Sequence, residues 1–303
     1  VPLEEFADQY RLYSLWEAET PEEVLQELGP TCQVAVVRGK FTAEMMDLLP
    51  RLKLLAVCGV GYDNVDVEAA IQRGVKVTNT PDVLTEDVAD LAVGLMLAAG
   101  RRIVKGDRYV RAGLWKSKGM MTFTGRVQGR RVGIIGLGRI GLAIAKRCEG
   151  FNMEVAYHNR NRRNDVPYAY KSSPGELAEW TDYLVVAIPG GKETYHLVDA
   201  EVLKALGPEG TLVNVGRGSN IDHGALARAL QDGTLGAAAL DVVAGEPEVP
   251  PELLAIDENL VLQPHHASGT FDTRRAMVEL AFANVEAFFT GGPLLTPVPE
   301  CGL

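Results

Sequence analysis

The chain has 303 residues, of which 47% are hydrophobic and 23% are charged. This composition gives enough apolar material for two globular domains, and it excludes a disordered or fibrous protein. A formal net charge of -10 disfavours bulk binding to nucleic acid or to anionic membranes, because both attract basic surfaces.

Short β-branched runs alternate along the chain with stretches of helical pattern. The opening residues 2–9, PLEEFADQ, have a helical pattern, and a last helix is expected to end near Gly291. The predicted strands cover residues 34–37, 54–57, 76–78, 131–135, 154–157, 183–188, 211–215, 237–242 and 260–262. Alternation of this kind predicts an α/β fold with parallel sheets and helices on both faces.

The longest apolar run, residues 88–99, contains Asp90 and is too short and too polar to cross a bilayer. We expect it to form a core or interface helix. Two turn-rich breaks, at residues 100–102 and 267–270, predict domain boundaries. Residues 100–270 would form a dinucleotide-binding domain, and residues 1–99 with 271–303 would form a discontinuous substrate-binding domain.

The cysteines are widely scattered, and no metal-ligand spacing of cysteine or histidine occurs. A chain of this size also does not need disulfide bonds for its stability. We therefore expect a cytoplasmic protein with reduced thiols and no metal. The four thiols are those of Cys32, Cys58, Cys148 and Cys301.

A glycine-rich loop, GIIGLGRIG, follows the predicted strand 131–135 and opens the helical stretch 140–147. A lone G-x-G-x-x-G is weak evidence, but here it has the strand, turn and helix that dinucleotide binding requires. Gly136 permits the tight turn, Gly138 lets the backbone approach a pyrophosphate, and Gly141 lets helix and strand pack closely. Leu137, Arg139 and Ile140 complete the predicted phosphate-binding loop.

The end of the following strand lacks the acidic residue that usually holds the adenosine ribose. In its place stand Asn159, Arg160, Asn161, Arg162 and Arg163. Clustered arginines on a loop are often only a solvated face, yet the missing carboxylate and the added cations change the site in the same direction. We expect NADP(H), with Arg160 as the direct partner of the 2′-phosphate and Arg162 or Arg163 assisting.

Three candidate catalytic residues stand near the ends of predicted strands: Arg217, Glu246 and His265. Open α/β sheets place their ligand crevice at the carboxyl ends of strands, so the three side chains could converge there. Arg217 could instead belong to a surface turn, and Glu246 could be a solvated carboxylate. His266 is expected to point away from the side chain of His265.

Four motifs carry a resemblance to a known family: GIIGLGRIGLAIAKR, LVNVGRGSNID, GAAALDVVAGEPEVP and LQPHHASGT. In this order and spacing they resemble the D-isomer-specific 2-hydroxyacid dehydrogenases, and most closely the glyoxylate/hydroxypyruvate reductases. The resemblance implies two doubly wound α/β domains, of Rossmann or flavodoxin type, with the active site in the cleft between them. It also implies a homodimer built around residues 87–99 and the arm that follows. The family normally opens with a strand, whereas this chain opens with a helical pattern.

The resemblance also implies a role for each candidate residue. Arg217 would hold the substrate carboxylate and polarise the keto oxygen, because its planar fork can bond two oxygens at once. His265 would donate the proton to the oxygen, and Glu246 would orient the ring and favour its charged form. Val60, Gly61 and Ser268 would complete the substrate site, and the nicotinamide site would include Pro189, Val215, Gly216 and Asp241.

The activity expected from this resemblance is the NADPH-dependent reduction of small 2-keto acids, glyoxylate to glycolate and hydroxypyruvate to D-glycerate. A larger substrate such as hydroxyphenylpyruvate is an alternative, because the sequence does not give the size of the pocket. A second alternative is a non-catalytic, nucleotide-sensing protein that resembles the family's corepressor branch. Tyr62 and Trp115 could line the substrate pocket, although packing roles are the simpler reading for both.

Overall fold

The computed structural model describes residues 4–301, and the chain divides into two compact units. The residues up to Leu84 form unit 1 together with those from Gly269 onward, and Thr85–Ser268 form unit 2. Both units are built on parallel sheets, which confirms the predicted α/β fold class.

Unit 1 is built on three parallel strands in the order β1-β2-β3 (Val34–Val37, Leu54–Val57 and Lys76–Thr78). Strand β2 is buried on both faces, because successive side chains of a strand point to opposite sides. Leu54 and Ala56 pack against the long helix α13 (Phe271–Thr290), whereas Leu55 and Val57 belong to a second core cluster. The remaining helices are α1 (Glu4–Ala7), α2 (Pro21–Leu28), α3 (Ala43–Asp47) and α4 (Val67–Gln72), with short 3-10 turns at Leu15–Glu17 and Pro299–Cys301.

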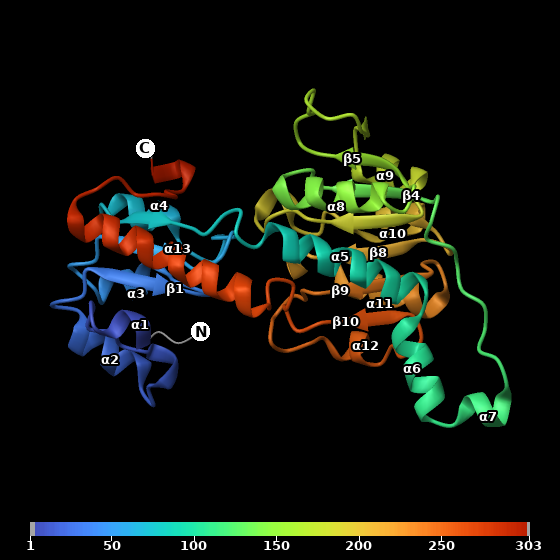
Figure 1. The fold of residues 1–303 in the computed structure, drawn as a ribbon, viewed down its shortest axis with the longest axis horizontal. Helices are drawn as coiled ribbons and strands as arrows, with labels where there is room; N and C mark the ends of the chain where they lie inside the picture. Colours follow the sequence, from blue (N-terminus) through green and yellow to red (C-terminus); the bar gives the residue numbers. More distant parts are fainter. Residues whose placement is uncertain (1–3, 302–303) are drawn as a thin grey trace. The chain divides into compact units, whose positions relative to one another are not determined.

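Unit 2 contains a parallel sheet whose seven strands have the order β10-β9-β8-β7-β4-β5-β6. The first of them along the chain, β4, lies inside the sheet between β5 and β7 (Figure 1). The strand order therefore reverses at β4, which marks the point where doubly wound folds bind their ligands. The strands are β4 (Arg131–Ile135), β5 (Glu154–His158), β6 (Ala169–Tyr170), β7 (Tyr183–Val186), β8 (Thr211–Asn214), β9 (Ala237–Leu240) and β10 (Leu260–Leu262).

Two groups of helices pack against this sheet. Helices α5 (Thr85–Gly100) and α8 (Arg139–Glu149) pack together, α5 against β8 to β10 and α8 against β4 and β5. The second group is α9 (Pro174–Trp180), α10 (Ala200–Leu206) and α11 (His223–Asp232), followed by the short α12 (Pro251–Leu254). No helix of the described residues has the length and hydropathy needed to cross a membrane.

Helix α5 belongs to unit 2, whereas the predicted boundary at residue 99 had placed it with unit 1. Its apolar residues are buried around most of its circumference, and it packs against α8 and three strands. Gly100 continues this helix. A Cβ at Gly100 would lie 2.6 Å from the hydroxyl oxygen of Tyr183, so this glycine permits close packing inside unit 2.

The predicted strands agree with the structure except at their ends. Strands β7, β8 and β9 end one or two residues before their predicted ends, because the chain leaves the ladder there and enters the loops that carry the candidate site residues. The two-residue strand β6 was not predicted.

Each of the four cysteines, all within the described residues, is a free thiol, and burial raises the pKa of Cys148 to about 12.

An arm of two short helices, α6 (Ile103–Arg111) and α7 (Leu114–Lys118), follows α5 and extends from the body of unit 2 (Figure 1). Neither helix has a buried residue. Ion pairs of Lys105 with Glu258 and of Arg108 with Asp257 hold α6 to the loop before β10. The arm and its return segment nevertheless expose large apolar side chains, among them Trp115, Met120 and Phe123.

Candidate active site

The glycine loop has the geometry that its three glycines predict. A Cβ at Gly136, where φ is +98°, would lie 2.5 Å from the carbonyl oxygen of Ala187, and a Cβ at Gly141 would lie 2.1 Å from that of Gly136. A Cβ at Gly138 would instead enter open space. The first and third glycines therefore allow tight packing, while the second leaves the start of α8 accessible. The residues present fit a bound pyrophosphate, which prefers exposed amides at a helix N-terminus.

Asn159, at the position where the acidic residue was missing, has a structural role. Its Oδ1 accepts a hydrogen bond of 2.7 Å from the backbone amide of Leu137, so its side chain holds the glycine loop. The side chain of Asn159 is uncharged, so it does not exert the repulsion that a carboxylate at this position would exert on a 2′-phosphate.

The three arginines after β5 have different environments. Arg160 is 80% exposed and forms an ion pair of 2.6 Å with Glu193. Arg162 lies over the ring of Tyr170, at 6.0 Å from its centroid. Arg163 donates to the carbonyl of Leu137 and is paired with Asp165, so its guanidinium stabilises the loop itself.

These contacts separate the predicted phosphate partners into two groups. Arg160 and Arg162 are the more exposed, as is Asn161, whereas Arg163 is half-buried. The hydrogen bond from Arg163 lowers the pKa of Asp165, which keeps that carboxylate ionised. Arg160 therefore remains the candidate for direct contact with a phosphate, and Arg163 is better described as a support of the glycine loop.

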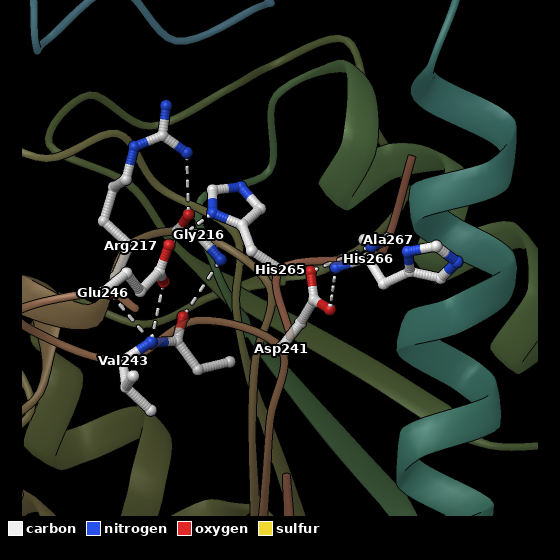
Figure 2. A network of polar contacts seen from close by, with 9 residues as sticks. Gly216, Arg217, Asp241, Val243, Glu246, His265, His266 and Ala267 are labelled. Carbon is white, nitrogen blue, oxygen red and sulfur yellow. Dashed lines mark hydrogen bonds and ion pairs between the residues drawn. The ribbon is translucent and has the colours of Figure 1, made fainter. Parts of the chain in front are cut away.

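His265 and Glu246 form a hydrogen-bonded pair, in which Nδ1 of the ring lies 2.7 Å from Oε2 of the carboxylate (Figure 2). Oε1 of Glu246 accepts a second bond of 2.9 Å from the amide of Val243, which fixes the carboxylate from the other side. Burial by itself would raise the pKa of Glu246. The bonds from His265 and Val243 and the positive charge of Arg217 outweigh it, and the pKa is lowered. The carboxylate is therefore anionic at neutral pH.

The three candidate catalytic residues converge because their strands are neighbours. Arg217 follows β8, Glu246 follows β9 and His265 follows β10, and these strands are adjacent in the sheet. The Nε2 side of the His265 ring is left for a substrate, because the pair with Glu246 uses Nδ1. Figure 2 shows the ring of His266 pointing away from Glu246, as predicted.

Asp241 holds the loop that carries His265. Its side chain is only 1% exposed, and its two carboxylate oxygens accept from the amides of His266 and Ala267 at 2.7 and 3.1 Å (Figure 2). Its carbonyl accepts from the amide of His265 at 2.8 Å. His265 itself has φ of +51°, a left-handed conformation that costs a non-glycine residue about 1 to 3 kcal/mol. Asp241 was predicted to line the nicotinamide site, and in the structure it fixes this strained turn.

Two asparagines, both fully buried, hold the backbone of Arg217, and neither was predicted. The side chain of Asn214 donates a hydrogen bond of 2.8 Å to the carbonyl of Arg217 and accepts one of 3.0 Å from the amide of Gly216. The side chain of Asn220 accepts a hydrogen bond of 2.8 Å from the amide of Arg217. Only Asn214 gave a signal in the sequence, as a polar residue at the end of an otherwise apolar strand. The guanidinium of Arg217 also donates to the carbonyl of Gly216 at 2.9 Å (Figure 2).

The remaining predicted residues of unit 2 lie in the loops around these strands. The carbonyl of Pro189 accepts from Asn220 at 3.1 Å, which connects the loop after β7 with that of Arg217. Val215 and Gly216 are buried at the end of β8, and a Cβ at Gly216 would lie 2.6 Å from the carbonyl oxygen of Ile188. Ser268 is the last residue of unit 2.

The predicted substrate residues Val60 and Gly61 lie in unit 1, in the loop after β2. The carbonyl of Val60 accepts from the side chain of Asn79 at 2.9 Å, so this loop is held from within its own unit. The neighbouring Tyr62 bonds to Glu300 at 3.1 Å, and burial together with this bond raises its pKa to about 12. Tyr62 is thus tied to the C-terminal turn of unit 1.

Comparison with known proteins identifies the family. The sequence profile described as "D-isomer specific 2-hydroxyacid dehydrogenase, NAD binding domain" matches residues 93–267, more than half of the chain. This chain belongs to the D-isomer specific 2-hydroxyacid dehydrogenase family. The matched range contains the glycine loop, Arg217, Glu246 and His265, so the resemblance inferred from the motifs is confirmed.

Similar members of the family are named as reductases of hydroxyphenylpyruvate or of glyoxylate and hydroxypyruvate. A hydroxyphenylpyruvate reductase from Plectranthus scutellarioides is 46% identical over 297 residues, covering 97% of this chain and 94% of the relative. The glyoxylate/hydroxypyruvate reductase A of Arabidopsis thaliana is 50% identical over 256 residues, covering 84% and 81%.

A solved structure is also similar to this chain. The NADPH-dependent glyoxylate/hydroxypyruvate reductase of Sinorhizobium meliloti, in complex with NADP and malonate, superposes with a TM-score of 0.87 at 44% identity, covering 95% of this chain and 88% of that one. The chain is therefore an enzyme of the 2-hydroxyacid dehydrogenase family that binds a nicotinamide cofactor, with glyoxylate/hydroxypyruvate reductases among its relatives.

Proposed function

We propose that this enzyme uses NADPH to reduce small 2-keto acids, converting glyoxylate to glycolate and hydroxypyruvate to D-glycerate. The observation that carries the proposal is the His265–Glu246 pair, 2.7 Å apart, beside Arg217 at the carboxyl ends of adjacent strands. A 2-keto acid offers a carboxylate to a guanidinium and a keto oxygen to an acid. These three side chains supply both partners.

The chain's own residues would divide the chemistry as follows. Arg217 binds the substrate carboxylate through its planar fork, and the buried asparagines behind it hold its backbone in place. The imidazolium of His265 donates the proton from Nε2 to the keto oxygen as negative charge develops there. Glu246 bonds to Nδ1 of the ring and fixes its orientation, so that Nε2 faces the substrate. The nicotinamide, when bound, supplies the hydride for the carbonyl carbon.

The preference for NADPH rests on the end of β5. Asn159 provides no carboxylate there, and Arg160 and Arg162 provide exposed positive charge in a protein of net charge -10. The similarity to a reductase whose structure contains NADP supports the same choice.

The expectation of a cytoplasmic location stays a prediction.

Reduction of a larger 2-keto acid is the second candidate. The Plectranthus scutellarioides relative, which aligns over 97% of this chain, is named a hydroxyphenylpyruvate reductase. A non-catalytic nucleotide sensor is less well supported, because it has no need of the Glu246–His265 pair that the chain keeps. The first two candidates therefore share one reaction, the reduction of a 2-keto acid, and differ only in the size of the substrate.

A panel of keto acids assayed with both reduced cofactors tests the proposal. We expect glyoxylate and hydroxypyruvate to give higher kcat/KM than hydroxyphenylpyruvate, and NADPH to exceed NADH by roughly tenfold to ten-thousandfold, the range for one or two hydrogen bonds to a charged group. Arg160→Ala should lower this ratio, and the effect should shrink at high salt because the loop is exposed. A parent ratio at or below one would overturn the cofactor assignment, and hydroxyphenylpyruvate as the best substrate would favour the second candidate.

We also propose that the enzyme is a homodimer that uses the arm of α6 and α7. Trp115 is 63% exposed and Phe123 is 88% exposed, which is costly for aromatic side chains in water. A second copy of the chain would cover them. Sedimentation equilibrium should give a dimer near twice 32.7 kDa, and paired Trp115→Ser and Phe123→Ser substitutions should shift it toward monomer. A parent protein that sediments as a monomer would contradict this proposal.

A further inference from the structure

An ion pair joins the loops that follow the two strands on either side of β4. Arg160 follows β5 and Glu193 lies in the loop after β7, and these two strands flank β4, which leads into the glycine loop. Nη1 of Arg160 and Oε2 of Glu193 are 2.6 Å apart. The carboxylate of Glu193 is therefore held by the same side chain that is proposed to bind the 2′-phosphate.

The turn that carries Glu193 is anchored. It is a 3-10 turn of Lys192–Thr194, and the hydroxyl of Thr194 bonds to the carbonyl of Pro189 at 2.8 Å. Nδ2 of the fully buried Asn220 donates to the carbonyls of Pro189 and Thr194 at 3.1 and 3.3 Å. Both ends of the loop are therefore fixed to a buried side chain, which holds the backbone that carries Glu193, while the side chain of Glu193 is 75% exposed.

We propose that Glu193 is a specificity-determining residue that competes with the 2′-phosphate of the cofactor for Arg160. This inference rests on the proposed use of NADPH. A phosphate that binds Arg160 either replaces the carboxylate oxygen at Nη1 or binds the other guanidinium nitrogens beside a like charge, and both weaken its binding. A ribose with a 2′-hydroxyl is uncharged and does not have to open the pair. The arginines favour the binding of NADPH over that of NADH, and Glu193 therefore makes this difference in affinity smaller.

Binding of two half-cofactors separates this effect from catalysis. Titration calorimetry would measure 2′,5′-ADP and 5′-AMP on the full chain, for the parent and for Glu193→Gln. We expect Glu193→Gln to bind 2′,5′-ADP about twofold to fivefold more tightly. This factor corresponds to the stability of a typical exposed ion pair, which the phosphate no longer has to break. Binding of 5′-AMP should stay unchanged. In an Arg160→Ala background, Glu193→Gln should have a smaller effect on 2′,5′-ADP, because the group for which both anions compete is gone.

Glu179→Gln is the matched control, since it removes one exposed carboxylate from α9 and gives the same net charge. Unchanged or weaker binding of 2′,5′-ADP in Glu193→Gln would overturn the inference, as would an equal gain in Glu179→Gln. Weaker binding of 5′-AMP in Glu193→Gln would also overturn it, because Glu193 would then be an acceptor for the ribose hydroxyl. The proposed cofactor is judged separately, by whether the parent prefers 2′,5′-ADP to 5′-AMP.

Discussion

Replacement of His265 by alanine is expected to lower turnover by about two to four powers of ten, which is what a positioned general acid contributes. Nucleotide binding should persist, because the glycine loop lies on a different part of the sheet from β10. The measurement is kcat for keto-acid reduction at saturating substrates, together with titration of NADPH fluorescence to show that the cofactor still binds.

The left-handed conformation of His265 calls for a second variant. Alanine at φ of +51° is strained, whereas asparagine adopts this conformation more readily, so His265→Asn separates loss of the acid from loss of the turn. Both variants should lose turnover to a similar extent. His266→Ala is the control, because its ring points away from Glu246 (Figure 2), and it should cost far less. Near-normal turnover in His265→Asn would remove His265 from the catalytic role.

Replacement of Arg217 by alanine is expected to weaken substrate binding by about 2 to 5 kcal/mol, the range for truncating one partner of a buried charge pair. In KM this corresponds to about thirtyfold to several thousandfold. The loop should keep its shape, because the bonds from Asn214 and Asn220 reach the backbone of Arg217 and do not depend on its side chain. The measurement is KM for the keto acid at saturating cofactor.

Lysine at position 217 should restore only part of the loss, because a point charge cannot reproduce the two parallel bonds of a guanidinium. Arg228→Ala, which removes an exposed arginine from α11, gives the same change in net charge and should leave KM unaltered. If Arg217→Ala kept both KM and turnover, Arg217 would belong to a surface turn after all.

Much of unit 2 follows from the sequence because its signals are local. The strand, the three glycines and the helix that begins after Gly138 are adjacent in the chain, so their arrangement depends on short-range backbone preferences. Glu246 and His265 are 19 residues apart. The common edge of parallel strands predicted only that they could converge, and their pairing was implied by the family resemblance.

Features that depend on tertiary contacts did not follow from the sequence. The apolar pattern of α5 shows that the helix is buried, but it does not show which core buries it, and Gly100 gave no sign of its packing against Tyr183. Asn220 is a polar residue in a turn by sequence, yet it is fully buried between two loops. Glu193 lies 33 residues from Arg160, so their ion pair became visible only in three dimensions.

The contact between Asn159 and the glycine loop separates the shape of this site from its charge. The bond to the amide of Leu137 uses only Oδ1, an atom that an aspartate would present in the same position. Asparagine and aspartate are isosteric, so either could hold the loop, and only the second terminal atom would change from a donor to an anionic acceptor. A single base change in a codon converts asparagine to aspartate, so the charge at this one position can change while the architecture is inherited intact.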